Sequence, residues 1–111
     1  MLDNVDEFAI VLTTVPSEEL GKEIAQTLLK AKLAACINLF PIQSYYTWQG
    51  EINCDSELQL IIKTRHDLLP QITETIQSLH SYEIPEILVL PIVEGSQPYL
   101  QWLKNSLRNN K

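Results

Sequence analysis

Two segments with a helical repeat, each lying between strand-like runs, restrict the possible fold of this chain more than any other feature. The first spans residues 17–32, where Ser17 is placed to cap the helix and apolar residues recur every four positions. In the second, Asp67 is placed as the cap, Pro70 falls in the first turn and the repeat stops around His80. The two apolar stripes are Leu20, Ile24 and Leu28, and Ile72, Ile76 and Leu79. The pattern predicts two amphipathic helices that each cover a sheet.

Four runs of residues have the composition of strands. They cover residues 8–14, 34–52, 57–63 and 87–93. The second run is long for a strand, so we expect it to bend, and Pro41 should lie at the bend or on an unpaired edge because proline cannot donate to a ladder. A turn around Gly50 joins this run to the next one, which predicts an antiparallel hairpin.

The order of these elements predicts the fold. Strand, helix, strand, strand, helix and strand make the βαββαβ arrangement of ferredoxin-like α+β folds, with a four-stranded antiparallel sheet. Right-handed crossovers place both helices on one face of that sheet. Ser96 and Pro98 open a short C-terminal helix that carries Leu100, Leu103 and Leu107 on one side. We expect a single domain over residues 1–111, frayed at residues 1–6 and 108–111.

A sheet with helices on one face leaves its other face uncovered, and this chain adds an aromatic hairpin to that exposed surface. Tyr45, Tyr46 and Trp48 lie on a strand longer than a domain of this size needs. We therefore predict an oligomer in which sheets extend from one copy to the next, with these three aromatics at the interface. In the alternative, the aromatics fold back onto their own core.

The charge of the chain and its apolar runs indicate which partners to expect. With 14 acidic and 8 basic residues and a formal net charge of −6, the chain repels nucleic-acid phosphates, so we expect no nucleic-acid partner. Its apolar runs are far shorter than the ~20 residues that span a bilayer, and residues 1–7 lack the features of a secretory signal. We expect no membrane association and a cytoplasmic location.

The two cysteines predict a reducing compartment and no disulfide framework. Cys36 follows small apolar residues in a strand, which favours an inert core thiol over a metal ligand. Cys54 follows the hairpin turn among polar neighbours, so we expect it to be exposed.

The sequence matches no enzyme template. It has two histidines, His66 and His80, and neither has a spacing that indicates a nucleophile and its base. It has three glycines, at positions 21, 50 and 95, which is too few for a glycine-rich phosphate cradle. We predict that the protein is not an enzyme.

Six segments, taken in order, are similar to the motif series of the CutA1 divalent-cation-tolerance family. They are residues 13–16 (TTVP), 32–38 (KLAACIN), 46–50 (YTWQG), 62–64 (IKT), 82–87 (YEIPEI) and 99–103 (YLQWL). The resemblance covers nearly the whole chain and implies the ferredoxin-like fold independently. It also implies a cytosolic homotrimer, structural similarity to the PII signalling proteins, an association with tolerance of divalent metals such as copper, and no established enzymatic reaction.

The resemblance further implies a metal site at Thr13, His80 and Glu86. Thr13 occupies the position of the family's cysteine ligand, and a hydroxyl is a poor ligand for soft copper. No cofactor is therefore required, and His80 and Glu86 are expected to bind Cu(II) or another divalent metal weakly. In the alternatives, His80 contacts the carbonyls at the end of its helix, and Glu86 pairs with backbone or with another subunit.

An alternative function is that of a PII-like signalling or scaffold protein. Such a protein would bind a small anionic metabolite in clefts between subunits, with Lys32, Lys63 or Arg65 as its positive groups. The competing interpretation of these bases is solvation or ion pairing with the fourteen acidic residues.

Overall fold

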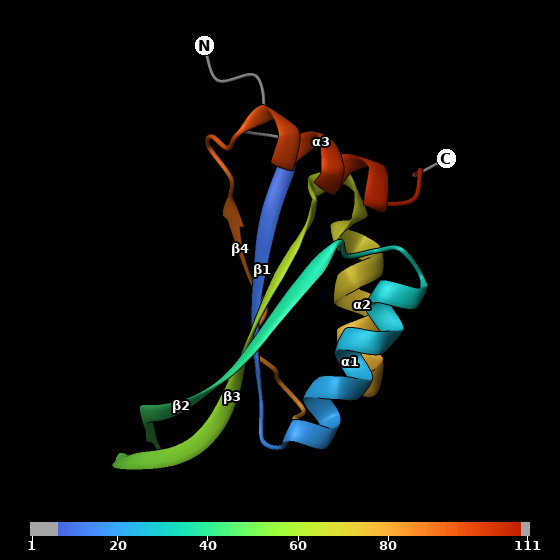
Figure 1. Ribbon diagram of the computed structural model, residues 1–111. Helices are drawn as coiled ribbons and strands as arrows, with labels where there is room; N and C mark the ends of the chain where they lie inside the picture. Colours follow the sequence, from blue (N-terminus) through green and yellow to red (C-terminus); the bar gives the residue numbers. More distant parts are fainter. Residues whose placement is uncertain (1–6, 110–111) are drawn as a thin grey trace.

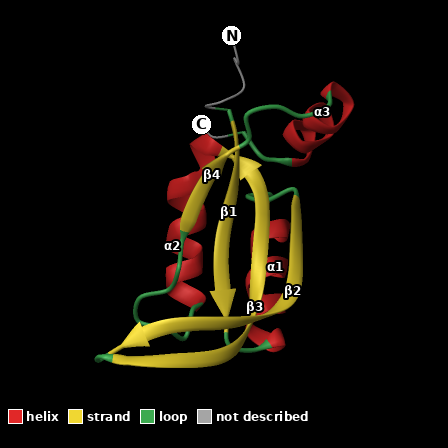
Figure 2. Cartoon of the chain, turned by 90° about the vertical axis from the view of Figure 1, so that its left-hand side faces the viewer, coloured by secondary structure: helices red, strands yellow, loops and turns green. Residues whose placement is uncertain are grey.

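In the computed structural model, which describes residues 7–109, one antiparallel sheet is covered on one face by two helices (Figures 1 and 2). The elements are β1 (Phe8–Val15), α1 (Glu18–Lys30), β2 (Cys36–Trp48), β3 (Glu51–Arg65), the 3-10 helix η1 (His66–Leu68), α2 (Leu69–Leu79), β4 (Leu88–Pro91) and α3 (Gln97–Ser106). The strand order is β2-β3-β1-β4. This order confirms the predicted ferredoxin-like α+β fold.

The core lies between the sheet and the two long helices. Val11 and Val15 on β1 point to the same side as Leu60 and Ile62 on β3, because side chains two residues apart share a face of a strand. The helices bury Ile24 and Leu28 of α1, and Ile72 and Ile76 of α2, against them. In Figure 2, α2 lies under the β1–β4 half of the sheet and α1 under the β2–β3 half.

The predicted cap of the first helix is confirmed, and that of the second is wrong. The hydroxyl of Ser17 accepts the N–H of Leu20 at 3.2 Å. Asp67 instead lies in η1, where its carboxylate accepts the Nε–H of Arg65 at 2.6 Å, and α2 begins at Leu69 without a side-chain cap. A guanidinium beside Asp67 gives that carboxylate a stronger partner than a backbone amide would.

The hairpin is longer than predicted. β2 and β3 pair from Cys36 opposite Lys63 to Trp48 opposite Glu51, so β3 begins at Glu51 and not at residue 57. The turn residues Gln49 and Gly50 have φ values of 52° and 80°, and two positive φ values suit the right-handed twist of a tight hairpin. Pro41 lies on β2, which is an edge strand, as expected.

Part of this hairpin projects beyond the rest of the sheet. β1 pairs with β3 only as far as Val15 opposite Leu58, so residues 42–57 form a two-stranded extension that we call the ribbon. In Figure 2 the ribbon bends away from the direction of the other strands. About half of the β2–β3 hairpin therefore extends past the end of β1, and there the two strands pair only with each other.

At the opposite end of the sheet, the three predicted leucines close the core: Leu100 and Leu103 lie in α3, and Leu107 is its C-cap residue. Residue 108, expected to fray, is instead held by its backbone. The Arg108 N–H donates to the Lys32 carbonyl at 3.0 Å, and the Arg108 carbonyl accepts from the Arg65 guanidinium at 2.8 Å. The fraying expected for residues 1–6, 110 and 111 lies outside the described residues.

Within residues 7–109, no helix combines the length and the apolar character needed to cross a bilayer.

Candidate functional site

The face of the sheet opposite the helices, which we call the open face, is apolar and exposed. Leu88 and Leu90 lie there beside Leu12 and Ile10, their partners on β1, with exposed fractions of 56% and 47%. Phe40 on β2 adds a further side chain that is 40% exposed. An apolar surface shared by several strands is unusual on a monomer and typical of a surface that binds another protein.

The ribbon carries the three aromatics that the sequence placed at an interface. Tyr45, Tyr46 and Trp48 are 74%, 43% and 64% exposed, and none of them joins the core cluster. The alternative, in which they fold back onto their own core, is therefore wrong. Their place in an oligomer interface stays a prediction.

A network of phenols and carboxylates ties the ribbon to the loop after α2. Tyr46 donates its hydroxyl hydrogen to Asp55 within the ribbon, and Tyr82 in the loop donates to Glu57 at 2.7 Å. The pKa of Tyr82 is raised, first because burial disfavours the charged phenolate and then because its hydrogen bond favours the neutral form. The hydrogen bond to Asp55 likewise raises the pKa of Tyr46. These hydrogen bonds were not predicted from the sequence, although Asp55 and Glu57 are two residues apart, as neighbouring side chains on one face of a strand are.

The raised pKa of Tyr82 predicts a loss of stability at high pH. The folded-state pKa lies above that of the unfolded chain, so the contribution is complete below about pH 10 and declines as the pH rises further. We expect the free energy of unfolding, measured by urea denaturation from pH 8 to 11.5, to fall over the upper part of this range. Tyr82→Phe should flatten the fall in part, because Tyr46 contributes in the same direction. Tyr99→Phe leaves the network intact and should match the parent chain. An identical pH profile for Tyr82→Phe and the parent would contradict this role.

The ring of His80 is fully engaged within the chain. Its Nδ1 lies 3.0 Å from the Tyr82 backbone N–H, which can only donate, so Nδ1 accepts and the proton of the neutral ring is on Nε2. Nε2 donates to the Thr14 carbonyl on β1 at 2.7 Å. His80 thus contacts a strand carbonyl rather than the end carbonyls of its own helix. It clamps the start of the loop, and a metal could bind it only if one of these bonds were broken.

The other residues of the implied metal site do not complete one within a single chain. Thr13 is fully buried on the helix side of β1, and Glu86 is exposed in the loop before β4. Among residues 7–109, no three histidine, cysteine, aspartate or glutamate side chains gather closely enough to hold a metal ion. These residues therefore do not fit a high-affinity metal site in one protomer.

The hydroxyl of Thr13 is buried without a hydrogen-bond partner, which predicts that valine is the better residue at this position. A buried polar group without a partner costs about 1–3 kcal/mol, and valine has the same shape as threonine without the hydroxyl. We expect Thr13→Val to raise the free energy of unfolding by about 1 kcal/mol or more in urea denaturation.

Thr64→Val is the matched control for this substitution. Thr64 is equally buried, but its hydroxyl donates to the Leu33 carbonyl at 2.6 Å. Its replacement should lower the free energy of unfolding, because the carbonyl loses its partner. Loss of stability in both variants would contradict the account of Thr13.

The three bases proposed for an anion site differ in their surroundings. Arg65 is occupied, since its guanidinium bonds Asp67 and the Arg108 carbonyl. Lys63 lies on the open-face side of β3 with its ammonium 5.9 Å from the centre of the Tyr99 ring. Lys32 follows Ala31, the C-cap of α1, and has a left-handed conformation with φ of 57°. Arg65 is therefore removed from the set of candidate anion ligands.

The two cysteines lie at opposite ends of the hairpin. Cys36 is half-buried opposite Lys63 and does not join the core cluster, so its assignment as a core thiol is wrong. Cys54 is exposed, as expected, and lies opposite Tyr45.

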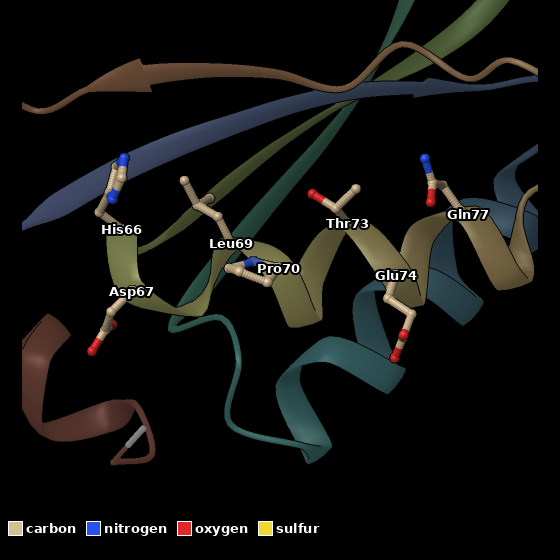
Figure 3. A pocket seen from close by; sticks show the side chains of 7 residues that line it. All are labelled: His66, Asp67, Leu69, Pro70, Thr73, Glu74 and Gln77. Atoms are coloured by element: carbon tan, nitrogen blue, oxygen red, sulfur yellow. The ribbon is translucent and has the colours of Figure 1, made fainter. Parts of the chain in front are cut away.

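A groove runs along the outer side of α2. Its volume is about 630 Å³, and we call it the α2 groove (Figure 3). The residues that line it are His66, Asp67, Leu69, Pro70, Thr73, Glu74 and Gln77. His66 is exposed in this groove. The sequence did not predict the groove, because a groove depends on how far α2 reaches past the strands above it.

Comparison with known proteins gives one consistent family. A family model described as CutA1 divalent ion tolerance protein matches residues 9–106. Protein CutA, chloroplastic, from Arabidopsis thaliana is 50% identical over 101 residues, which are 90% of this chain and 56% of the relative. The divalent-cation tolerance protein CutA of Thermus thermophilus is 47% identical over 98 residues, 87% of this chain and 95% of that protein. The chain thus spans little more than half the length of the plant relative and nearly all of the bacterial one.

Solved structures agree with this match. The crystal structure of CutA1 from Oryza sativa superposes with a TM-score of 0.91 at 44% identity and covers 97% of this chain and 100% of that one. The Thermus thermophilus structure has a TM-score of 0.87 at 45% identity, with 91% and 99% covered.

Proposed function

The chain belongs to the CutA1 divalent ion tolerance family, and from this premise we propose that it is a trimeric, non-catalytic divalent-cation-tolerance protein of the cytosol. The observation that supports the trimer is the exposed apolar surface of the open face together with the ribbon aromatics. A single chain leaves this surface in water, and further copies of the same chain can cover it.

Symmetry determines which strands would meet in such a trimer. The sheet has two edges, β2 and β4. A junction of like edges, β2 with β2 or β4 with β4, pairs two copies and then stops, whereas a ring of three needs the β2 edge of one copy against the β4 edge of the next. The bend of the ribbon lets successive sheets turn, as a closed ring requires (Figure 2).

The edge of β4 can accept such a strand. The Ile92 N–H donates to the Phe8 carbonyl at 3.1 Å. Hydrogen-bonded pairs alternate along an antiparallel ladder, so residues 88, 90 and 92 direct their backbone groups toward β1. Val89 then directs both its N–H and its carbonyl outward, and Pro91 directs only a carbonyl outward. A partner strand would bond chiefly to Val89.

The arrangement of the thiols and of His80 supports a non-catalytic role in a reducing compartment. Cys36 and Cys54 face Lys63 and Tyr45 rather than a histidine, and the hairpin register keeps the two cysteines far apart. Both nitrogens of His80 are bonded, which leaves that ring without a free base. The cytosol is part of the proposal, since one relative's name carries the word chloroplastic and the structure from Archaeoglobus fulgidus is described as periplasmic.

The metal part of the proposal is weak binding of Cu(II) or another divalent ion at the His80 and Glu86 end of the molecule. One chain gathers too few ligands there, so further groups would come from water or from other copies. Any ion that uses His80 must displace either the Thr14 carbonyl or the Tyr82 N–H from its ring. We expect this competition to keep the affinity low.

Native mass spectrometry with and without Cu(II) tests both parts of the proposal. We expect a three-chain species in both conditions, with copper adducts that fall in His80→Ala and in Glu86→Ala and persist in His66→Ala. Single chains in both conditions would contradict the trimer. Adducts unchanged in His80→Ala and Glu86→Ala would contradict the metal assignment and leave the trimer intact.

A further inference from the structure

The side chains of the α2 groove fall into two sets. His66, Leu69, Thr73 and Gln77 recur every three or four residues and point toward the side on which β1 and β4 pass, as Figure 3 shows. Asp67 and Glu74 point away from the strands. The strand-facing set is uncharged when His66 is neutral, and the two acidic groups form the outer wall.

The groove lies beneath the edge of the sheet, where little covers it. α2 packs under the β1–β4 half, and β4 is the last strand. Val89, whose side chain points toward the helices, is 40% exposed for this reason. A strand added outside β4 would place every second side chain over the strand-facing set of the groove.

The direction of the strands decides which side of an incoming strand faces the groove. β2 and β1 run one way, and β3 and β4 run the other. An antiparallel junction between β2 of one copy and β4 of the next keeps this alternation, and both copies then carry their helices on the same side of the joined sheet. One side of the ribbon continues the face of the sheet that carries α1 and α2 in the same chain. This side of the ribbon therefore meets the α2 groove of the neighbouring copy.

The two sides of the ribbon differ in charge. The helix side carries Gln43, Tyr45, Thr47, Ile52, Cys54 and Ser56, all uncharged, and Gln43 bonds Ser56 across it at 3.0 Å. The other side carries Glu51, Asp55 and Glu57 beside Tyr46 and Trp48. Asp67 in the outer wall is paired with Arg65, so Glu74 carries the negative charge that an incoming strand would meet. The acidic side of the ribbon would be repelled by Glu74, and the neutral side would not. Strand direction and charge thus select the same side.

We propose that the α2 groove of each copy receives the Tyr45 side chain from the ribbon of the neighbouring copy. The proposal rests on the proposed trimer and names its contact. Tyr45 is the aromatic residue on the neutral side of β2, and it is 74% exposed in its own chain. In the groove its ring can pack on Leu69 and Pro70, and its hydroxyl can bond the polar side chains of Thr73 and Gln77.

Photocrosslinking from position 45 tests this contact directly. The full chain carrying Tyr45→p-benzoylphenylalanine is mixed with ¹⁵N-labelled parent chain, illuminated and mapped by mass spectrometry, so that contacts between copies are recognised by their mixed isotopes. We expect the cross-links between copies to fall within residues 66–77. The same label at Tyr46, on the opposite side of the ribbon, is the control and should not reach these residues.

A steric variant gives a second readout that does not depend on the label. Thr73→Trp fills the groove, and we expect it to weaken association of the copies at least tenfold in light-scattering dilution series. Ser78→Trp places the same bulk at an exposed position of α2 outside the groove and should associate like the parent chain.

The outcomes separate the two proposals. Cross-links from position 45 that fall outside residues 66–77 in a three-chain particle would overturn the groove assignment and leave the trimer standing. Equal association of Thr73→Trp and Ser78→Trp would overturn it as well. Single chains in every sample, with cross-links only within one chain, would instead show that the proposed function had failed.

Discussion

Trp48→Ala is expected to break the proposed trimer into single chains or to produce aggregates, and this is one of the two largest effects that we predict. The indole is 64% exposed in one chain, so the fold of that chain gains little from it. If Trp48 is central to the interface, its truncation costs about 3 to 5 kcal/mol per contact, which weakens association by roughly a hundredfold or more. Light scattering at micromolar concentration measures the change in mass.

Leu29→Ala is the matched control for this experiment. Leu29 is an exposed apolar residue of α1, on the helix layer and away from both the ribbon and the open face. Its truncation should leave the particle mass unchanged. A Trp48→Ala protein with the mass and the urea midpoint of its parent would show that Trp48 has no part in an interface.

Ile62→Ala is expected to destabilise the protomer itself more than any surface change. Ile62 is fully buried at the centre of the sheet, opposite Val11 on one side and Ile37 on the other. Removal of its outer carbons leaves a cavity between the strands and the helices, at a cost of about 2–5 kcal/mol in the free energy of unfolding. Urea denaturation at a fixed chain concentration measures it, because association also stabilises the folded chain.

Two related substitutions calibrate this result. Ile62→Val removes a single methylene group and should cost only about 0.5–1.5 kcal/mol. Ile84→Ala removes the same atoms as Ile62→Ala from a side chain that is 87% exposed, so the fold of the chain should lose little stability. Similar losses for Ile62→Ala and Ile84→Ala would contradict the placement of the core.

The elements that the sequence predicts well are those set by local patterns. The four-residue repeat of α1 and its Ser17 cap depend on neighbouring residues, and the structure confirms both. The hairpin turn follows from Gly50, which adopts a positive φ at no steric cost. The order of strands and helices then leaves few ways to build a sheet, so the fold class follows from local information.

The features that the sequence analysis missed depend on partners distant along the chain. The sequence around Asp67 predicts a helix cap, but in the structure its carboxylate accepts a hydrogen bond from Arg65. The sequence around His80 allows a metal ligand, but in the structure its ring is bonded to the Thr14 carbonyl on β1. The sequence did not predict that β3 begins at Glu51, because residues 51–56 are largely polar. The alternation of apolar and polar residues marks a strand with one buried face, and neither face of the ribbon is buried in a core. Tertiary contacts, not local preference, decide these cases.

The ribbon and the open face are the surfaces that the proposed trimer would cover. In one chain they are exposed apolar surface, and the edge strands β2 and β4 carry unpaired backbone groups. A closed ring of three copies would cover the ribbon, the open face and the strand edges, because the same contact is repeated between each pair of neighbours. The clamp at His80 and the Tyr82–Glu57 bond would then hold the loop before β4 in place for that contact.

The mass of the purified particle tests the account most directly. We expect light scattering across a dilution series down to micromolar chain concentration to give three times the 12.7 kDa of one chain. A uniform population with the mass of one chain over the same series would contradict it, because the exposed sheet and ribbon would then be stable in water without a partner.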